Sequence, residues 1–259
     1  MDAVPRGERP LSHLDPAIDV WSPDDGVRRV LVVAAHPDDV DFGTAGTVAA
    51  FTKAGIGVTY CIVTNGDAGG SDRAMTRSDM AELRQREQRA AAAEVGVTDV
   101  RFLGYPDGRL LPTIELRRDI SRVIRQVQPE RVLCPSPERR WDFIYASHPD
   151  HLAAGEASVC AVYPDARNPF AHPELLADEG LEPWTVNELW IMGGEGPNVA
   201  VETTSTIERK VAALLSHKSQ IGDPAGVTER ITTNGQAQGE VAGLPAGASA
   251  ELFRVTRIP

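Results

Sequence analysis

The sequence has little of what membrane, secreted and nucleic-acid-binding proteins need. No apolar run approaches the roughly 18 residues that cross a bilayer, and the first 28 residues contain no apolar signal-peptide core. Basic residues are also few: 26 Lys and Arg stand against 37 Asp and Glu, a formal net charge of −11. Such a surface repels phosphate backbones and anionic lipids. We therefore expect a cytoplasmic protein that binds neither nucleic acid nor a membrane.

Cysteines number only three, and all of them lie within apolar segments, which is typical of small core residues: Cys61, Cys134 and Cys160. At 259 residues the chain is long enough to bury a large core within one domain. We expect a single domain over residues 29–259, preceded by an irregular arm over residues 1–28. His13, in that arm, is expected at the surface.

Apolar runs alternate with helical patterns along the whole domain. Residues 29–35 and 57–64 have the composition of buried parallel strands, and the small residues of 43–54 suit a helix that packs closely on a sheet. Further strands are expected at 99–103, 131–134, 186–192, 199–202 and 251–258, and helices at 80–95, 114–127, 151–162 and 207–217. The alternation predicts an α/β fold: a Rossmann-like, mainly parallel sheet with helices on both faces.

The first expected strand ends abruptly in the polar sequence His36-Pro37-Asp38-Asp39. Ligands of open α/β sheets bind beyond the carboxyl ends of the strands, so these side chains lie where a substrate is expected. His36 and Asp39 are close enough in sequence to bind one metal ion together, which leaves Asp38 free. A dinucleotide site is excluded, because it would need G-x-G-x-x-G at this turn and two carboxylates would repel a pyrophosphate.

A second polar motif, His148-Pro149-Asp150-His151, lies 112 residues further on (148 − 36). Its proline suits the first turn of a helix. With His151 as a third ligand, His36 and Asp39 would form a two-histidine, one-carboxylate set with an open position, which is typical of catalytic zinc. The same donors suit ferrous iron, so Zn2+ is the expected cofactor and Fe2+ an alternative.

Both motifs resemble those of the PIG-L or LmbE-like N-acetylglucosaminyl deacetylases, which carry AHPDD after the first strand and HPDH later. They stand here as Ala35–Asp39 and His148–His151. The likeness continues through TNGDAGG (64–70), FLGYPDG (102–108) and HKSQ (217–220), and so covers most of the chain. It implies an LmbE-like fold and an amino-sugar conjugate as substrate.

The resemblance also implies roles for residues that spacing alone does not single out. Arg84 and Asp107 match positions that bind substrate hydroxyls, and His217 matches a position near the pocket, where it would contact the substrate. Asp67 belongs to a loop that lies beside the metal in the family. Without the resemblance, Arg84 would be read as part of a solvated helical face and Asp107 as part of an ordinary turn.

The expected chemistry is amide hydrolysis without a protein nucleophile. A bound metal lowers the pKa of its water and polarises a carbonyl. Asp38, beside a ligand but not one itself, is placed to take a proton from the water and return it to the leaving amine. His148 is placed to stabilise the oxyanion as a cation or a donor, with Asp150 holding its orientation.

We therefore expect a zinc-dependent deacetylase of N-acetylglucosaminyl-type substrates. An amidase that cleaves thiol-conjugate (mycothiol-like) amides with the same metal centre is the alternative. A non-catalytic sugar- or metal-binding module is a third reading, which would leave Asp38 and His148 without a task. The sequence also leaves open a homo-oligomer.

Three further features have ordinary interpretations. Trp141, Phe143 and Tyr145 alternate, as in a half-buried extended segment, although they could instead form an aromatic wall for a sugar. Mycothiol-pathway relatives carry a Tyr two residues before HPDH, whereas Tyr145 stands three before it. His172 is expected to be exposed in a loop, and the Gly- and Ala-rich residues 234–249 are expected to form a loop or lid.

Overall fold

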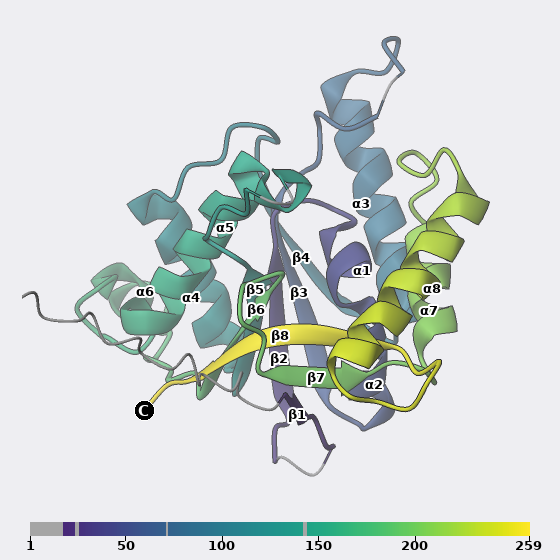
Figure 1. The fold of residues 1–259 in the computed structure, drawn as a ribbon. Helices are drawn as coiled ribbons and strands as arrows, with labels where there is room; N and C mark the ends of the chain where they lie inside the picture. Colours follow the sequence, from purple (N-terminus) through teal and green to yellow (C-terminus); the bar gives the residue numbers. More distant parts are fainter. Residues whose placement is uncertain (1–17, 24–25, 71, 142–143) are drawn as a thin grey trace, which may run out of the picture.

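The computed structural model describes residues 18–23, 26–70, 72–141 and 144–259. Within them, eight strands form one sheet in the order β1-β7-β8-β6-β5-β2-β3-β4 (Figure 1). The strands are β1 (Asp19–Val20), β2 (Arg29–Ala34), β3 (Gly57–Thr64), β4 (Asp99–Tyr105), β5 (Arg131–Pro135), β6 (Glu188–Met192), β7 (Val199–Glu202) and β8 (Ala250–Arg257). The predictions for His13 and Phe143 lie outside the described residues.

The central strands are parallel, and one strand near the edge reverses direction. β2 pairs in parallel with β3 on one side and β5 on the other, and β4 and β6 extend the parallel part outward. β8 lies between β6 and β7 and is antiparallel to both. The predicted mainly parallel α/β sheet is confirmed. The arm predicted over residues 1–28 contributes β1, which adds an edge strand to β7.

Helices cover both faces of the sheet (Figure 1). One face carries α1 (Asp39–Gly43), α2 (Ala45–Lys53), α3 (Arg77–Glu94), α7 (Ile207–Leu215) and α8 (Pro224–Val241). The other carries α4 (Ile114–Val127), α5 (Pro149–Cys160) and α6 (Pro173–Ala177), with a 3-10 turn at Ile144–Ser147 before α5 and a kink at Ala161–Asp165 after it, where Tyr163 is not helical. None of the helices in the described ranges is long and apolar enough to span a bilayer.

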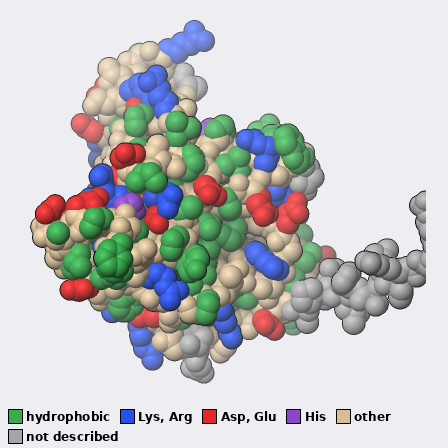
Figure 2. Space-filling view, turned by 90° about the vertical axis from the view of Figure 1, so that its left-hand side faces the viewer, with side chains coloured by type: hydrophobic (Ala, Val, Ile, Leu, Met, Phe, Trp, Pro, Cys, Tyr) green, Lys and Arg blue, Asp and Glu red, His purple; other side chains and the backbone are tan. Residues whose placement is uncertain are grey.

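The apolar run of β2 supplies both cores of the molecule. Val30, Val32 and Ala34 belong to the core under α2 and α3, while Leu31 and Val33 belong to the core under α4 and α5. Side chains of a strand alternate between its two faces, so a continuous apolar run is what a strand covered on both sides requires. Outside this core, Figure 2 shows the side of the molecule that carries α4 and α6, where apolar, acidic and basic side chains are intermixed.

Several helix boundaries follow from local capping. The side chain of Thr76 accepts a hydrogen bond from the amide of Asp79 and so begins α3, and Thr113 begins α4 in the same way. The helix expected over 43–54 is α2, within one or two residues at each end. A separate short helix, α1, was not expected; it precedes α2 and meets it at Thr44.

Two expectations about loops are wrong. The first half of residues 234–249 belongs to α8, in which Gly235 and Gly239 face the residues just before β8, and only the second half is a loop. A Cβ at Gly239 would lie 2.1 Å from the carbonyl oxygen of Ala248, so glycine here permits close packing rather than a turn. His172 is buried, not exposed, because its ring lies 3.4 Å from Asp165, which also accepts two hydrogen bonds from Arg117.

The first prediction concerns the packing of α8 at Gly239. Gly239→Ala must push α8 away from the chain before β8, and overpacking of this kind typically costs about 1 to 3 kcal/mol. Thermal unfolding should therefore show a clearly lower Tm. The matched control is Gly222→Ala, where an added Cβ meets nothing within 4 Å. Equal Tm values for the two variants would contradict the close contact.

Candidate metal centre and active site

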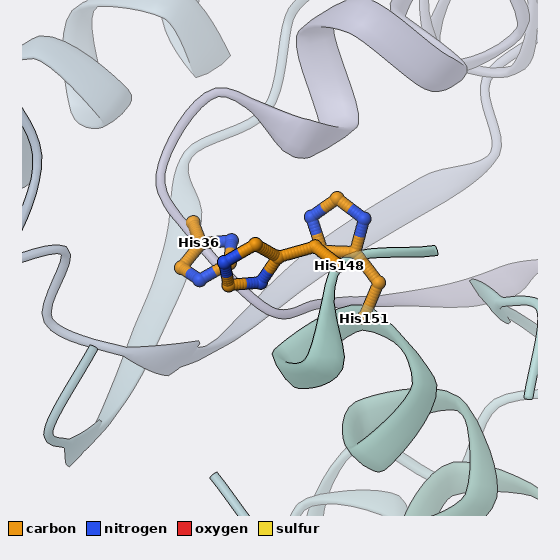
Figure 3. A group of neighbouring side chains, drawn as sticks. All are labelled: His36, His148 and His151. Carbon is orange, nitrogen blue, oxygen red and sulfur yellow. The ribbon is translucent and has the colours of Figure 1, made fainter. Parts of the chain in front are cut away.

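The polar motifs meet at the carboxyl edge of the sheet. His36 follows the last residues of β2, and α1 begins at Asp39, directly after the turn. His148 is the N-cap of α5, and His151 lies in the first turn of that helix. Figure 3 shows His36 and the two histidines from α5 turned toward one another. The fold therefore brings the two motifs side by side, although they are far apart in sequence.

Three imidazoles form the centre of this site. The ring centroid of His36 lies 4.9 Å from that of His148 and 5.2 Å from that of His151, and the latter two are 5.4 Å apart. One nitrogen from each ring lies within 4.8 Å of the others. Unprotonated ring nitrogens at such spacing are donors that could converge on one divalent ion.

Asp39 joins two of these rings through its two carboxylate oxygens. Its Oδ1 lies 3.0 Å from Nε2 of His151, and its Oδ2 lies 3.4 Å from Nδ1 of His36 and accepts the His36 amide at 2.8 Å. Burial alone would raise the pKa of Asp39, but the positive charges of His151 and His36 hold it well below its ordinary value. The predicted set of His36, Asp39 and His151 is thus brought together around one carboxylate.

The far side of the His36 ring faces two more carboxylates. Its Nε2 lies 3.1 Å from Asp150 and 3.2 Å from Asp107. Burial alone would lower the pKa of His36, yet Asp39, Asp107 and Asp150 together raise it to about 12. Nε2 donates to Asp107 and Asp150, and Nδ1, which faces only Asp39, is the nitrogen that would exchange its proton for a metal ion.

The carboxylate and the main-chain amide of Asp150 therefore have different partners. Its carboxylate contacts His36 and accepts the amides of Gly108 and Leu110 at 2.7 and 3.1 Å, whereas only its main-chain amide meets His148, at Nδ1 and 3.2 Å. The reason is local: the carboxylate at the start of α5 points across to the loop after β4. The predicted contact by which Asp150 holds His148 is made by the main-chain amide of Asp150, while its carboxylate serves His36.

The capping contact still decides which nitrogen of His148 can donate. Because Nδ1 accepts the amide of Asp150, the proton of the neutral ring lies on Nε2. Burial, together with the charges of His36 and His151, lowers the pKa of His148. Of the two predicted possibilities, a cation or a donor, this environment favours the neutral donor.

Asp38 lies beside the cluster in a strained backbone conformation. Its φ of 95° is in the left-handed region, where a residue other than glycine typically costs about 1 to 3 kcal/mol. Its carboxylate lies 3.3 Å from Nη2 of Arg84, and its amide donates to Oε1 of Gln88 at 2.8 Å. Burial and the negative charge of Asp39 raise the pKa of Asp38 to about 7, against the opposing charge of Arg84.

The expected substrate-contacting residues are largely occupied by the protein itself. The Arg84 guanidinium is buried and donates to the carbonyls of Pro37 and Gly66 as well as contacting Asp107 and Asp38. His217 is completely buried and lies 2.8 Å from Asp41, so it offers no atom to a substrate in this structure. Binding of sugar hydroxyls by Arg84 and Asp107 stays a prediction.

The loop after β3 supports this arrangement from outside. Asp67 accepts the amide of Asp107 at 2.9 Å and a hydrogen bond from Arg77 at 2.7 Å, and it therefore holds the loop that carries Asp107. Two buried residues, Gln88 and Asp41, were missed by sequence reasoning. The available signal was that Gln88 lies four residues after Arg84, on the same side of α3.

The segment before α5 forms an exposed rim. Trp141 and Tyr145 are 83% and 84% exposed, so the half-buried extended segment expected there is wrong. The segment is linked to the centre, because the main chain of Ala146 is hydrogen-bonded to His151. The alternative interpretation, an aromatic surface that binds a sugar, stays a prediction.

The fold and the donor set together define an α/β protein with a buried histidine and carboxylate centre suited to a divalent metal. More particularly, the chain belongs to the PIG-L family: the family model described as GlcNAc-PI de-N-acetylase matches residues 31–162, which include both polar motifs. The predicted resemblance is confirmed.

Individual relatives agree with this assignment. The chain is 34% identical over 210 residues to a diacetylchitobiose deacetylase of Thermococcus kodakarensis, covering 81% of this chain and 76% of the relative. It is 32% identical to a probable N-acetyl-alpha-D-glucosaminyl L-malate deacetylase 2 of Bacillus anthracis, covering 79% and 90%. Among solved structures, the N,N'-diacetylchitobiose deacetylase from Pyrococcus horikoshii superimposes with a TM-score of 0.81 at 28% identity, covering 90% and 85%.

The second prediction concerns Asp150. Asp150→Asn should place an amide donor against the amides of Gly108 and Leu110 or against Nε2 of His36, and His36 should lose its fixed tautomer. Loss of such a partner typically costs about 10- to 100-fold in metal affinity, measurable by competition with a chelator. Asp165→Asn is the matched control: it removes an equally buried carboxylate outside the cluster and should lower only the Tm. Unchanged metal affinity in Asp150→Asn would refute this role.

Proposed function

We propose that this protein is a metal-dependent amide hydrolase that removes the acetyl group from an N-acetylglucosaminyl-type substrate. The observation that carries the proposal is the joining of His36 and His151 through the two oxygens of Asp39, beside a separate carboxylate, Asp38. Family membership supports hydrolysis, and the names of the relatives support an acetylated amino sugar.

His36, Asp39 and His151 would hold the metal ion. The donors fit, because Nε2 of His36 donates to Asp150 and Asp107 and Nδ1 would exchange its proton for the metal. When bound, a divalent ion would polarise the amide carbonyl and lower the pKa of a water molecule. Two imidazoles and a carboxylate suit zinc and ferrous iron alike, so zinc is our proposal and iron the alternative.

Asp38 is proposed as the group that moves protons. A general base works best when its pKa lies near the working pH, and burial places that of Asp38 at about 7. Asp38 would accept a proton from the attacking water and release it to the nitrogen of the leaving amine. Arg84, at 3.3 Å, would limit how far the carboxylate can turn.

His148 is proposed to stabilise the oxyanion. Its Nδ1 is occupied by the Asp150 amide, so Nε2–H is the donor left for the oxygen of the tetrahedral species. The neutral ring donates without adding another cation to a site that already contains Arg84. Its expected contribution is to rate more than to substrate binding.

The substrate beyond the acetylated sugar is less constrained. The relatives differ in the group joined to that sugar, which is a second sugar in one and malate in another. We propose that Trp141 and Tyr145, both exposed, would contact this part of the substrate. The amidase of thiol-conjugate amides stays the alternative function, and a cytoplasmic location and a homo-oligomer stay predictions.

The third prediction tests Asp38. Asp38→Asn keeps the size of the side chain but removes the base, so kcat should fall by about 100- to 10,000-fold while bound metal stays at the wild-type stoichiometry. Asp223→Asn, a substitution at the exposed N-cap of α8, is the control and should be neutral, since Asn caps as well as Asp. Near wild-type turnover in Asp38→Asn would remove Asp38 from this role.

The fourth prediction is a panel of amine-release assays. Protein stripped by a chelator should be inactive and should regain activity with zinc or, under anaerobic conditions, with ferrous iron. The repleted protein should release amine from N,N'-diacetylchitobiose and from N-acetylglucosaminyl malate faster than from a thiol-conjugate amide. A preference for the thiol conjugate would establish the alternative function, and full activity without any metal would contradict both.

A further inference from the structure

A buried chain of hydrogen bonds connects the turn after α7 to the backbone of Asp38. His217, at the start of that turn, places Nε2 2.8 Å from Oδ2 of Asp41. Both side chains are completely buried, so the Asp41 carboxylate depends on protein donors rather than on water. A second donor reaches the same oxygen from α3, where Nε2 of Gln88 lies 2.9 Å away.

Gln88 is held in one orientation by partners of opposite kind. Its Nε2 donates to Asp41, while its Oε1 accepts the main-chain amide of Asp38 at 2.8 Å. Turning the side-chain amide over would place a donor against a donor and an acceptor against a carboxylate. If Asp41 moved, Gln88 would lose its fixed orientation, and its hydrogen bond with the amide of Asp38 would weaken.

The same peptide unit is held from its other side. The carbonyl of Pro37 accepts Nη2 of Arg84 at 2.6 Å, and the amide of Asp38 donates to Gln88. Arg84 and Gln88 are four residues apart on α3, so one face of this helix grips both ends of the Pro37–Asp38 peptide. A residue with φ of 95° keeps that conformation only when its surroundings impose it, and this grip is what imposes it.

We propose that His217 is a positioning residue that acts through Asp41 and Gln88 to hold the Pro37–Asp38 peptide and so to aim the Asp38 carboxylate. This inference rests on the proposed catalytic role of Asp38. It replaces the predicted contact of His217 with the substrate, since the side chain is buried behind α1. It also explains a motif, His217–Gln220, that the proposed reaction does not use directly.

The turn has a separate anchor that supplies a control. Ser219 donates its hydroxyl to Oε2 of Glu87 at 2.6 Å, and its amide donates to Oε1 at 2.8 Å. These bonds fasten the turn to α3 without touching Asp41 or Asp38. Ser219→Ala should therefore lower the stability of the same turn and leave the peptide grip intact.

The test compares two replacements of His217. In His217→Gln the side-chain nitrogen can reach the place of Nε2, whereas in His217→Asn it is too short. We expect His217→Asn to lower kcat on N,N'-diacetylchitobiose by about 10- to 100-fold, the scale of a small misplacement of a reacting group, with little change in KM. His217→Gln should stay within a few-fold of wild type, and so should Ser219→Ala.

A second readout does not depend on activity. Hydrogen exchange at the Asp38 amide, followed by NMR in the zinc-loaded protein, should become at least about tenfold faster in His217→Asn but not in Ser219→Ala, because only the former frees this amide to open. Metal content should match wild type throughout. If His217→Asn does not fold, Gln88→Met should reproduce the fall in kcat and the faster exchange.

The outcomes separate the inference from the proposed function. Faster exchange at Asp38 in a protein that deacetylates no amino sugar would support the hydrogen-bond chain and refute the reaction. Wild-type exchange in His217→Asn and Gln88→Met would overturn the inference, whether or not activity falls. Equal losses of kcat in His217→Asn and Ser219→Ala would reduce His217 to a stabilising role and would also overturn it.

Discussion

The candidate metal centre depends on one buried imidazole, that of His36, which is contacted by three carboxylates. Asp39 lies on the Nδ1 side of His36, and Asp107 and Asp150 lie on the Nε2 side. Buried negative charges of this kind are costly unless positive charge and hydrogen-bond donors surround them. These carboxylates raise the pKa of His36 to about 12, because a proton on its ring supplies the positive charge that they need. A metal ion on Nδ1 would supply the same charge.

The groups around His36 come from parts of the chain that are far apart in sequence. The turn after β2 supplies His36 and Asp39, the loop after β4 supplies Asp107 and the amides that bind Asp150, and the start of α5 supplies Asp150 itself. The parallel strands end at one edge, so short loops are enough to bring these groups together. The stability of the folded sheet thus offsets the unfavourable free energy of placing these carboxylates close together.

Next to this centre, α3 serves as a rigid support rather than as a solvated helix. Its buried polar side chains hold the Pro37–Asp38 peptide, and Asp38 keeps a conformation that a free chain would leave. Strain at Asp38 is tolerable because the two cores on either side of β2 provide the stability. Arg84, which is predicted to bind sugar hydroxyls, thus has a structural role as well.

Much of the fold could be predicted, and the failures have identifiable causes. β3, α4 and β7 have the predicted bounds because hydrophobic periodicity reports burial directly. The reversed direction of β8 was not foreseen, since side-chain alternation is the same in parallel and antiparallel strands. Glycines in α8 were mistaken for loop residues, because sequence does not show that Gly239 faces the carbonyl of Ala248.

For the site, the sequence by itself determined which residues are the candidates for the chemistry: two short polar motifs, each placed at an element boundary. Only the tertiary structure decided their partners. It assigned the Asp150 carboxylate to His36 instead of His148, and it buried His217 against Asp41. The physical reason is that residue type and spacing specify which groups can bond, whereas the direction of a hydrogen bond depends on how separate helices and loops are packed.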